Sequence, residues 1–495
     1  MKIYEYMAHE LIQKVKDGEI SISSIIHQTF ERIENTENRI HSFVNLYKEE
    51  ALENAKRLDK KLKSGKELGR LYGLPIGIKD LICVKDKLTT CGSKILGGYK
   101  PPFSATVIEK LLNIENAIYI GSTNMDEFAM GSSTENSSYG PTYNPWNLTC
   151  VPGGSSGGSG ASIASGQVMC SLGSDTGGSI RCPASYCGVT GLKPTYGRVS
   201  RYGLIAYANS LDQIGPITKC VKDAALLLEI MASYDPKDST SVKREVENYI
   251  TNLNQDINGK KVGLPVEFFK EGLEKSVENK VSSAVKKLEK LGAEPVELSL
   301  PHIEYTIPTY YIIAMSEASS NLARFDGLLF GNTSEDKSGD VYEAISKTRR
   351  KYFGEEVKRR ILLGTFALSA GYYDMFYMKA LKARNLIKKD FEEAFRKCDV
   401  IVSPTMPTTA FKIGELISNP LEMYLMDILT CPVNLAGLPA LSIPCGFDQK
   451  GLPIGFQIIG NYFEEENILN IGYKLEQELN IYRRLPKMKG GKIDE

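Results

Sequence analysis

Two stretches rich in glycine and serine, close together in the chain, restrict most strongly what this sequence can form. Residues 153–160 read GGSSGGSG, and residues 174–179 read SDTGGS. Glycine-rich loops often hold phosphate, but a P-loop needs a lysine directly after its last glycine, and a dinucleotide-binding loop needs another glycine spacing. Neither pattern is present. Because two such stretches occur together, serine chemistry explains them better than turns alone.

A serine nucleophile needs a proton acceptor, and this chain offers no histidine for that role. Its four histidines, at positions 9, 27, 41 and 302, lie far in sequence from both stretches. Lys79 ends an apolar, strand-like run, residues 74–78, and is the better candidate. A lone lysine is usually a solvated surface charge. Lys79 could act as a base only if burial lowers its pKa enough to leave the amine neutral.

The second stretch is placed to stabilise negative charge. It follows the apolar residues 170–172 and precedes a segment in which Pro183 fits the first turn of a helix. Backbone N–H groups at the start of a helix lack partners within it and lie at its positive end. Such groups suit an oxyanion that forms on an attacked carbonyl. We therefore expect an oxyanion hole at Thr176, Gly177 and Gly178.

Composition narrows the class of protein. The chain has 495 residues, and its 60 basic and 60 acidic side chains give a formal net charge of zero. A protein that holds nucleic acid by itself usually carries a basic surplus. The ten cysteines show no CxxC or zinc-type spacing, which favours structural thiols in a reducing compartment and no metal site. With neither a signal-peptide core nor a membrane-length apolar run, we expect a cytoplasmic protein without membrane contact.

Helical and strand-like patterns alternate along the chain. Apolar residues recur at helical spacing in the first 65 residues, with Ser21 or Ser23 as the expected N-cap of one helix. Further helices are expected at 105–112, 223–232, 273–291 and 464–479, and strands at 74–84, 117–120, 261–264, 295–300, 400–402, 440–444 and 453–459. This alternation predicts an α/β layered core.

No repeat or linker divides the chain, so we expect a single domain over residues 1–495. Its predicted parts are a helical N-terminal segment (1–65), a catalytic Gly/Ser core (66–220), a surface excursion (about 235–260) and a helical substrate-site segment (308–397).

Three stretches together, residues 77–80, 153–159 and 173–181, resemble the amidase signature family, and the resemblance covers nearly the whole chain. It implies an α/β fold in which a large, mixed, twisted β-sheet is covered by helices on both faces. Cys182 departs from the family pattern, which has glutamine there, and places a thiol near the site.

The resemblance also implies a Ser-cisSer-Lys triad. Carried over residue by residue, Ser179 is the nucleophile, Ser155 is the bridging serine, and Lys79 is the base. A cis peptide bond is implied between Gly154 and Ser155.

Flanking stretches narrow the resemblance to the glutamine-hydrolysing chains of glutamyl-tRNA(Gln) amidotransferases; they are residues 123–131, 193–200, 320–327, 356–360 and 434–439. This implies that the chain hydrolyses L-glutamine and needs no cofactor. The ammonia would pass to the B chain of such an amidotransferase, which uses ATP and Mg²⁺ to amidate the mischarged tRNA bound mainly to it, with a small C chain completing a heterotrimer. Whether Asp-tRNA(Asn) is also a substrate stays open. The alternatives are a stand-alone amidase of small or aryl amides and a catalytically silent scaffold protein.

A glutamine substrate would need a cation for its carboxylate and an anion for its ammonium group. Arginine suits the carboxylate because its planar guanidinium can donate two parallel hydrogen bonds. Arg360 is the candidate, with Arg359 as the alternative. The resemblance assigns the ammonium group to Asp427, and Tyr311 or the adjacent Tyr310 is expected to line the pocket.

Overall fold

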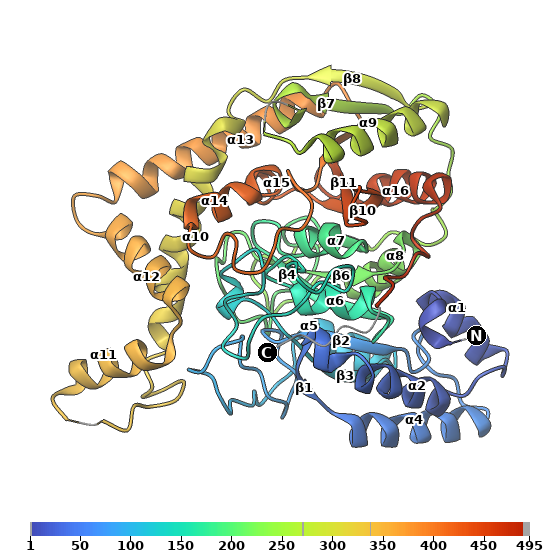
Figure 1. Cartoon of the computed structure of the whole chain (residues 1–495), viewed down its shortest axis with the longest axis horizontal. Helices are drawn as coiled ribbons and strands as arrows, with labels where there is room; N and C mark the ends of the chain where they lie inside the picture. Colours follow the sequence, from blue (N-terminus) through green and yellow to red (C-terminus); the bar gives the residue numbers. More distant parts are fainter. Residues whose placement is uncertain (1, 270–271, 337, 489–495) are drawn as a thin grey trace.

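A single mixed β-sheet forms the framework of the molecule (Figure 1). The computed structural model describes residues 2–269, 272–336 and 338–488. The sheet has eleven strands in the order β1-β3-β2-β4-β6-β5-β10-β11-β9-β7-β8. The strands are β1 Phe43–Leu46, β2 Pro75–Lys79, β3 Ile118–Thr123, β4 Cys170–Asp175, β5 Thr190–Lys193, β6 Gln213–Thr218, β7 Lys261–Pro265, β8 Glu294–Leu298, β9 Val400–Pro404, β10 Ala440–Phe447 and β11 Pro453–Gly460.

The helices that surround this sheet come from the whole length of the chain. They are α1 Ala8–Lys16, α2 Ile22–Glu34, α3 Glu37–Ile40, α4 Lys48–Lys63, α5 Thr106–Ile108, α6 Gly157–Ala164, α7 Arg181–Cys187, α8 Val221–Met231, α9 Lys275–Lys290, α10 Thr306–Asn321, α11 Val341–Tyr352, α12 Glu355–Leu368, α13 Lys379–Ala394, α14 Pro420–Leu425, α15 Cys431–Ala436 and α16 Glu465–Leu479. Short 3-10 or π-helical turns are η1 Ile3–Glu5, η2 Glu109–Ile114, η3 Glu127–Ala129, η4 Val266–Phe269, η5 Ile303–Tyr305, η6 Leu322–Arg324, η7 Asp374–Met378 and η8 Met426–Leu429. None of the helices in the described ranges is long and apolar enough to cross a membrane.

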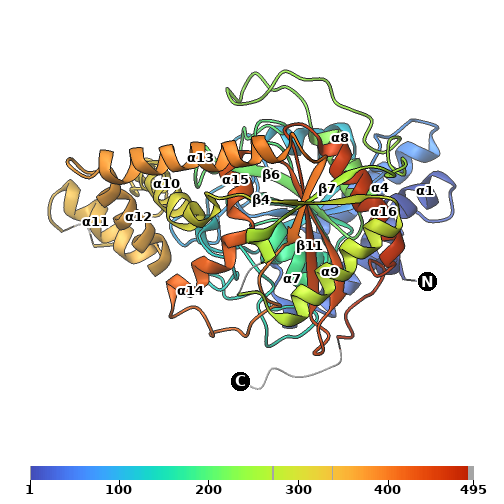
Figure 2. The same cartoon turned by 90° about the horizontal axis from the view of Figure 1, so that it is seen from above.

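Both faces of the sheet are covered, as the family resemblance implies (Figure 2). Gly455 of β11 lies against Ser185 of α7 so closely that a Cβ would overlap that side chain. Three residues further along the strand, Ile458 contacts Gly472 of α16. Residues an odd number apart on a strand point to opposite faces, so α7 and α16 pack on opposite sides. The predicted α/β fold is confirmed.

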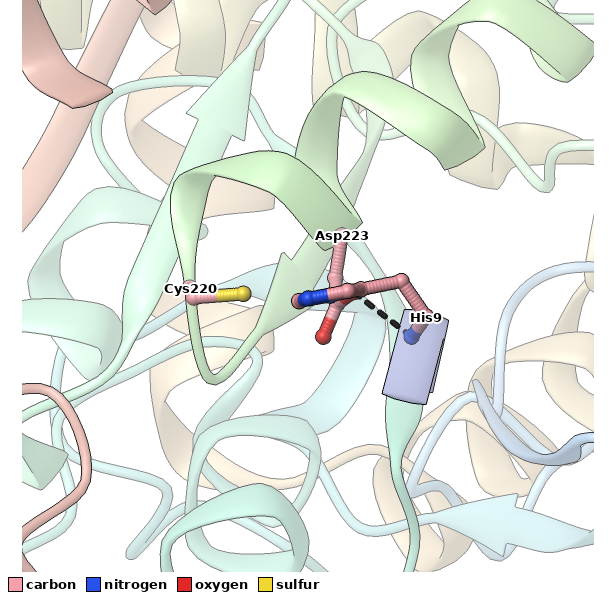
Figure 3. A group of neighbouring side chains, drawn as sticks. All are labelled: His9, Cys220 and Asp223. Atoms are coloured by element: carbon pink, nitrogen blue, oxygen red, sulfur yellow. Dashed lines mark hydrogen bonds and ion pairs between the residues drawn. The ribbon is translucent and has the colours of Figure 1, made fainter. Parts of the chain in front are cut away.

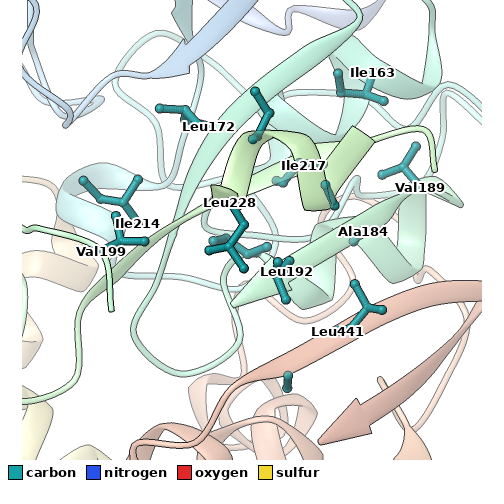
Figure 4. Close-up of a cluster of buried hydrophobic side chains, with 14 of the residues drawn as sticks. Ile163, Leu172, Ala184, Val189, Leu192, Val199, Ile214, Ile217, Leu228 and Leu441 are labelled. Atoms are coloured by element: carbon teal, nitrogen blue, oxygen red, sulfur yellow. The ribbon is translucent and has the colours of Figure 1, made fainter. Parts of the chain in front are cut away.

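The central strands are buried on both faces, as expected for a sheet that is covered by helices on both sides. Every residue of β4 and β6 is buried. Leu172 of β4, Ile217 of β6 and Leu228 of α8 belong to the cluster in Figure 4, and none of the three exposes any surface to solvent. This core holds the ends of the strands in fixed positions.

The N-terminal helices are fastened to the core through the start of α8. The Asp223 carboxylate accepts hydrogen bonds from the backbone N–H groups of Ala8 (2.8 Å) and His9 (3.0 Å), and it pairs with His9 Nδ1 at 2.7 Å (Figure 3). Cys220 lies beside them, so a group of potential metal ligands forms there. The carboxylate is already engaged as the cap of α1. At α2 the predicted cap is confirmed as Ser21, whose Oγ accepts from the Ser24 N–H at 3.1 Å.

Most predicted elements are present, and the differences are local. The expected strand 74–84 ends at Lys79, because the chain then turns and Ile82 N–H donates to the Lys79 carbonyl at 2.9 Å. The helix expected at 105–112 divides into α5 and the π-helical turn η2. The first 65 residues also contain the edge strand β1, which the helical pattern did not predict. Helices α10–α13 extend beside the sheet (Figure 1).

Candidate active site

Lys79 lies at the edge of the sheet where two neighbouring strands end. It is the last residue of β2, and β2 runs parallel to β4, whose last residue is Asp175. The carboxyl ends of parallel strands meet at the same edge of a sheet. The loop after β4 therefore begins beside the Lys79 side chain.

The Lys79 amine is completely buried and engages two serines. Nζ donates to Ser155 Oγ at 2.7 Å and to Ser174 Oγ at 2.9 Å. Burial lowers the pKa of Lys79 from 10.5 to about 7, although the carboxylates of Asp126 and Asp175 oppose this shift. A neutral, proton-accepting lysine is therefore available near neutral pH.

Ser155 is held in the conformation that the resemblance implied. The peptide bond between Gly154 and Ser155 is cis, and the Ser155 carbonyl accepts a hydrogen bond from the Asp126 N–H at 3.3 Å. A side chain at Gly154 would overlap Asp126 and the backbone of Ser133. Position 154 must therefore be glycine for this loop to pack.

Ser179 lies next to this pair, in the turn between β4 and α7. Its carbonyl accepts from the backbone N–H of Ser156 at 3.2 Å, so the two Gly/Ser stretches are hydrogen-bonded to each other. Of the three triad candidates, Ser155 and Lys79 are fully buried, whereas Ser179 is 8% exposed. Its hydroxyl has no hydrogen-bond partner among the described residues. Ser179 is thus the member of the set that a substrate can reach.

The predicted oxyanion hole is only partly free. Gly178 donates its N–H to Asp175 Oδ1 at 2.9 Å, so this group is not available for an oxyanion. The backbone N–H groups of Thr176, Gly177 and Ser179 have no acceptor among the residues that the structure describes. Gly178 has φ = 138°, which favours glycine, and a Cβ there would overlap Thr430.

An extensive buried network supports this turn, and sequence reasoning assigned it no role. Arg181 pairs with Asp175 (Nη2–Oδ1, 2.9 Å) and donates to Gln457 Oε1 and Asn434 Oδ1, both at 2.6 Å. The guanidinium of Arg181 holds the pKa of Asp175 at about 2 despite complete burial. One signal was the presence of Asp175 and Arg181 within the glycine-serine motif. Of their distant partners, Asn434 begins one of the flanking stretches of the family resemblance, whereas Gln457 lies in none of them.

The three predicted substrate-binding residues lie close to one another. Tyr311 Oη donates to Asp427 Oδ2 at 2.8 Å, and the Arg360 guanidinium lies over the Tyr311 ring at 5.3 Å. All three side chains are buried. Burial raises the pKa of Asp427 to about 6, and hydrogen bonds from Tyr311 and Ser132 limit the increase. A cation and an anion therefore lie on either side of one tyrosine.

The neighbouring alternatives differ in burial and in hydrogen-bond partners. Arg360 is 3% exposed and donates to Glu356 (2.7 Å) and to Tyr207 Oη (2.7 Å), whereas the Arg359 side chain is 42% exposed and pairs with Glu356 from outside. Among the described residues nothing accepts a hydrogen bond from Arg360 Nη2. Tyr310, the alternative to Tyr311, is also buried.

Tyr310 and Tyr311 occupy different parts of the site. The Tyr310 ring packs on Gly177, while Tyr311 contacts Asp427 and stacks on Tyr424 with ring centroids 4.0 Å apart. Both tyrosines therefore line the region between the turn and Arg360, but only Tyr311 bonds to the candidate anion.

Cys182 has no nucleophilic role in this arrangement. Its Sγ contacts the Ser132 carbonyl at 3.6 Å, and burial raises the pKa of its thiol well above the usual value. A buried, protonated thiol is a weak nucleophile. Ser132 itself was not predicted, yet its hydroxyl donates to Asp427 at 2.9 Å.

Comparison with known proteins agrees with this geometry. The family model for the amidases matches residues 24–469. The chain belongs to the amidase family. Within the amidases it is 54% identical over 486 residues to the A chain of the glutamyl-tRNA(Gln) amidotransferase of Thermodesulfovibrio yellowstonii, an alignment that covers 98% of this chain and 100% of that protein.

Two further comparisons point to the same branch of the amidases. The corresponding amidotransferase chain of Halothermothrix orenii is 55% identical over 489 residues, covering 99% of this chain and 100% of that protein. The crystal structure of the corresponding chain from Thermotoga maritima superimposes with a TM-score of 0.82 at 40% identity, covering 98% of this chain and 99% of that one.

Proposed function

We propose that this chain is the glutamine-hydrolysing component of a Glu-tRNA(Gln) amidotransferase. The observation that carries this proposal is the contact between the candidate binding residues and the catalytic turn. Tyr311 bonds to Asp427 and lies under Arg360, and its neighbour Tyr310 packs on Gly177, two residues before Ser179. An amide substrate with both a carboxylate and an ammonium group fits a site that offers one cation and one anion. A small aryl amide would offer no carboxylate to the free Arg360 Nη2 and would leave the buried Asp427 without a cation, which is unfavourable.

The reaction begins when Ser179 Oγ attacks the side-chain carbonyl of glutamine. Ser179 gives its proton to Ser155, and Ser155 gives its own to the neutral amine of Lys79. The free N–H groups of Thr176 and Gly177 stabilise the oxyanion. Ser155 then gives a proton to the departing ammonia and regains one from Lys79, and the C–N bond breaks to leave a glutamyl ester on Ser179. Attack by water on this ester releases glutamate.

Substrate recognition follows from the same residues. Arg360 Nη2 is free to donate to the α-carboxylate of glutamine, because Nε and Nη1 are held by Glu356 and Tyr207. Asp427, oriented by Tyr311 and Ser132, accepts from the ammonium group. The two interactions hold the α-carbon end of glutamine by its two charged groups, so the side-chain amide at the other end can point toward Ser179.

The ammonia would be used by partner chains. Following the family resemblance, the B chain of the amidotransferase would amidate Glu-tRNA(Gln) with ATP and Mg²⁺, and a small C chain would complete the heterotrimer. The net charge of zero supports this division, because the tRNA would be held mainly by another chain. Asp-tRNA(Asn) is a second substrate to test in the same complex.

The test is co-purification of the chain with its candidate partner chains, followed by tRNA amidation assays with glutamine or with ammonium as nitrogen donor. We expect Ser179→Ala to abolish amidation from glutamine while amidation from ammonium continues. Ser64→Ala, at an exposed helix end, is the control and should change neither reaction. Unchanged use of glutamine by Ser179→Ala would identify a silent scaffold, and rapid turnover of aryl amides with poor use of glutamine would identify a stand-alone amidase.

A further inference from the structure

Glu127 joins the catalytic core to the helix that carries Arg360. Its side chain is 1% exposed, and Oε2 accepts the backbone N–H of Gly354 at 2.7 Å, while Oε1 accepts from the Ser93 hydroxyl. Gly354 is the N-cap residue of α12. A carboxylate at this position pairs with a free N–H group and with the positive end of the helix dipole.

The neighbouring residues on both sides make a second contact. Phe128 follows Glu127, Phe353 precedes Gly354, and the two rings meet edge to face with centroids 5.8 Å apart. Phe325 packs on the other side of Phe128 at 5.1 Å. Residues 127–128 and 353–354 therefore form a clasp with one polar and one aromatic contact.

The clasp includes an uncommon backbone conformation. Phe128 has φ = 50° and Ala129 has φ = 61°. The left-handed region costs a residue other than glycine about 1–2 kcal/mol. The Phe128 N–H donates to the Cys91 carbonyl at 2.9 Å, which helps to hold the turn. Strain of this kind persists where the surrounding structure fixes it, and it often occurs at functional sites.

On its other side, the clasp is continuous with the catalytic residues. Asp126, which precedes Glu127, donates its N–H to the Ser155 carbonyl at 3.3 Å. Its carboxylate accepts from the Thr134 N–H at 2.9 Å. Asp126 is therefore anchored to the bridging serine by its own backbone N–H, in a contact that does not involve the Glu127 side chain.

The arrangement of α12 makes such an anchor necessary. Helices α11 and α12 stand out from the body of the molecule (Figure 1), and three apolar side chains of α12 are exposed, namely Leu362, Leu363 and Phe366. Arg360 lies six positions after Gly354, so it is about 9 Å along the helix axis from the clasp. A small change in the direction of the first turn would move its guanidinium away from a bound carboxylate.

We propose that Glu127 is a positioning residue for substrate binding: by holding Gly354 at the start of α12, it aligns Arg360 with Ser179 for capture of the glutamine carboxylate. This inference rests on the proposed function, since it needs a substrate with a carboxylate. It assigns to Glu127 an effect on glutamine binding and none on the chemistry of Ser179.

Burial makes the ionised form of the Glu127 side chain unfavourable. Burial raises the pKa of Glu127 to about 7, and the cations Lys358 and Lys94 offset part of the increase. Above that pH the folded protein must hold a buried carboxylate, so this group lowers stability. Glutamine at position 127 keeps an acceptor for Gly354 without the charge. Glu127→Gln should therefore fold and keep the clasp closed.

The test measures glutamine-dependent and ammonium-dependent tRNA amidation by the complete complex. We expect Glu127→Ala to raise the KM for glutamine at least about tenfold while kcat stays within about twofold, because a hydrogen bond to a charged group is lost. Glu127→Gln should restore KM to within about threefold of the wild type. Amidation from ammonium should not change. A KM that Glu127→Ala leaves unchanged would overturn the proposal.

The matched control is Glu37→Ala. Glu37 is a half-buried glutamate that likewise accepts a backbone N–H (Phe43, 2.7 Å) and a serine hydroxyl (Ser42, 2.6 Å), but none of its hydrogen-bond partners among the described residues lies in α12. We expect this variant to lose stability with no change in the KM for glutamine. An equal change in KM for both variants would show a general effect of destabilisation and refute the specific role.

A double-mutant cycle tests whether Glu127 acts through Arg360. In an Arg360→Ala background, Glu127→Ala should raise KM no further, because the residue that it positions is absent. Additive effects would overturn the proposal. If Glu127→Ala does not fold, Glu127→Asp is the substitute, because it shortens the side chain by one methylene group. An unchanged KM for glutamine in Glu127→Asp would also refute the positioning role. A wild-type complex that cannot use glutamine would instead refute the proposed function itself.

Discussion

The pH dependence of glutamine hydrolysis should report the ionisation of Lys79. Only the neutral amine can accept the Ser155 proton, and burial lowers the pKa of this lysine from 10.5 to about 7. We therefore expect kcat/KM to rise with pH on the acidic side and to level off above neutrality. The plateau is the informative feature, because an exposed lysine would not produce one.

The size of the increase can be calculated. With a pKa of about 7, the neutral fraction rises from about a quarter at pH 6.5 to nearly all at pH 8.5, which gives about a fourfold increase in rate. A lysine that titrates at its ordinary pKa of 10.5 would give about a 100-fold increase over this range, without a plateau. The range lies above the pKa of Asp427, which is about 6, so loss of substrate binding contributes little.

The same pKa predicts that the contribution of Lys79 to stability also rises with pH, but over a higher range than activity. The unfolded chain keeps the Lys79 proton up to about pH 10.5, whereas the folded protein releases it near 7. This difference lowers stability by its full amount, about 5 kcal/mol, below pH 7, and it disappears as the pH rises to 10.5. Lys79→Met removes it and loses two hydrogen bonds worth about 1 kcal/mol each. We expect this variant to be inactive and more stable at pH 7.

The assay follows glutamate release by the reconstituted complex at constant ionic strength, with urea denaturation of the wild type and Lys79→Met at pH 7 and pH 10. Lys79→Arg serves as the charged control, because arginine cannot release its proton. A 100-fold increase without a plateau, or substantial activity in Lys79→Arg, would refute a neutral lysine base. If Lys79→Met is less stable than the wild type at pH 7, the conclusion that burial of the Lys79 amine lowers the stability of the folded protein is wrong.

Three further predictions concern the pocket and the network beneath it. Asp427→Asn should raise the KM for glutamine at least about tenfold in the amidation assay, because it removes the charge that faces the ammonium group. Arg360→Ala should have a similar effect, whereas Arg359→Ala, with its 42% exposed side chain, should change KM by less than about twofold. Arg181→Met should lower the free energy of unfolding in urea by about 3–5 kcal/mol, because it leaves the buried Asp175 carboxylate without its cation.

Each of these predictions has a contrary outcome. Equal effects of Arg359→Ala and Arg360→Ala would place the carboxylate site on the outer face of α12. An unchanged KM in Asp427→Asn would remove this residue from substrate recognition. For Arg181, the control is the double variant with Asp175→Asn, which should be less destabilised than Arg181→Met alone, because no unpaired charge remains. Equal losses would mean that packing, and not the ion pair, dominates.

The parts of the site that could be predicted are those encoded by local sequence. The strand before Lys79 and the helix after Ser179 follow from apolar runs and from Pro183. The pairing of Lys79 with Ser155, 76 positions apart, was reached through a family resemblance, because spacing alone does not bring two such distant residues together. The Arg181 network joins residues 253 and 276 positions apart, and no periodic pattern marks its members.

The oxyanion hole illustrates a different limit. The sequence predicted free N–H groups at the start of a helix, and Gly178 was included. In the structure the Gly178 N–H is not free, because it donates to the carboxylate of Asp175, three residues earlier in the chain. Contacts of this kind are typical of aspartate in turns. The Asp–x–x–Gly spacing could have indicated this competition, whereas the free groups at Thr176 and Gly177 depend on the path of the whole turn.

The charges around Lys79 explain why its pKa lies near neutrality and not far below it. Burial alone would lower the pKa further, but the carboxylates of Asp126, Asp175 and Asp212 oppose the shift. Each carboxylate is itself stabilised by donors, namely backbone N–H groups at Asp126 and Asp212 and a guanidinium at Asp175. A base is most effective when its pKa lies near the working pH, since a lower value weakens it and a higher value keeps it protonated. The buried acids therefore keep Lys79 basic enough to take the serine proton, while burial keeps it neutral enough to do so.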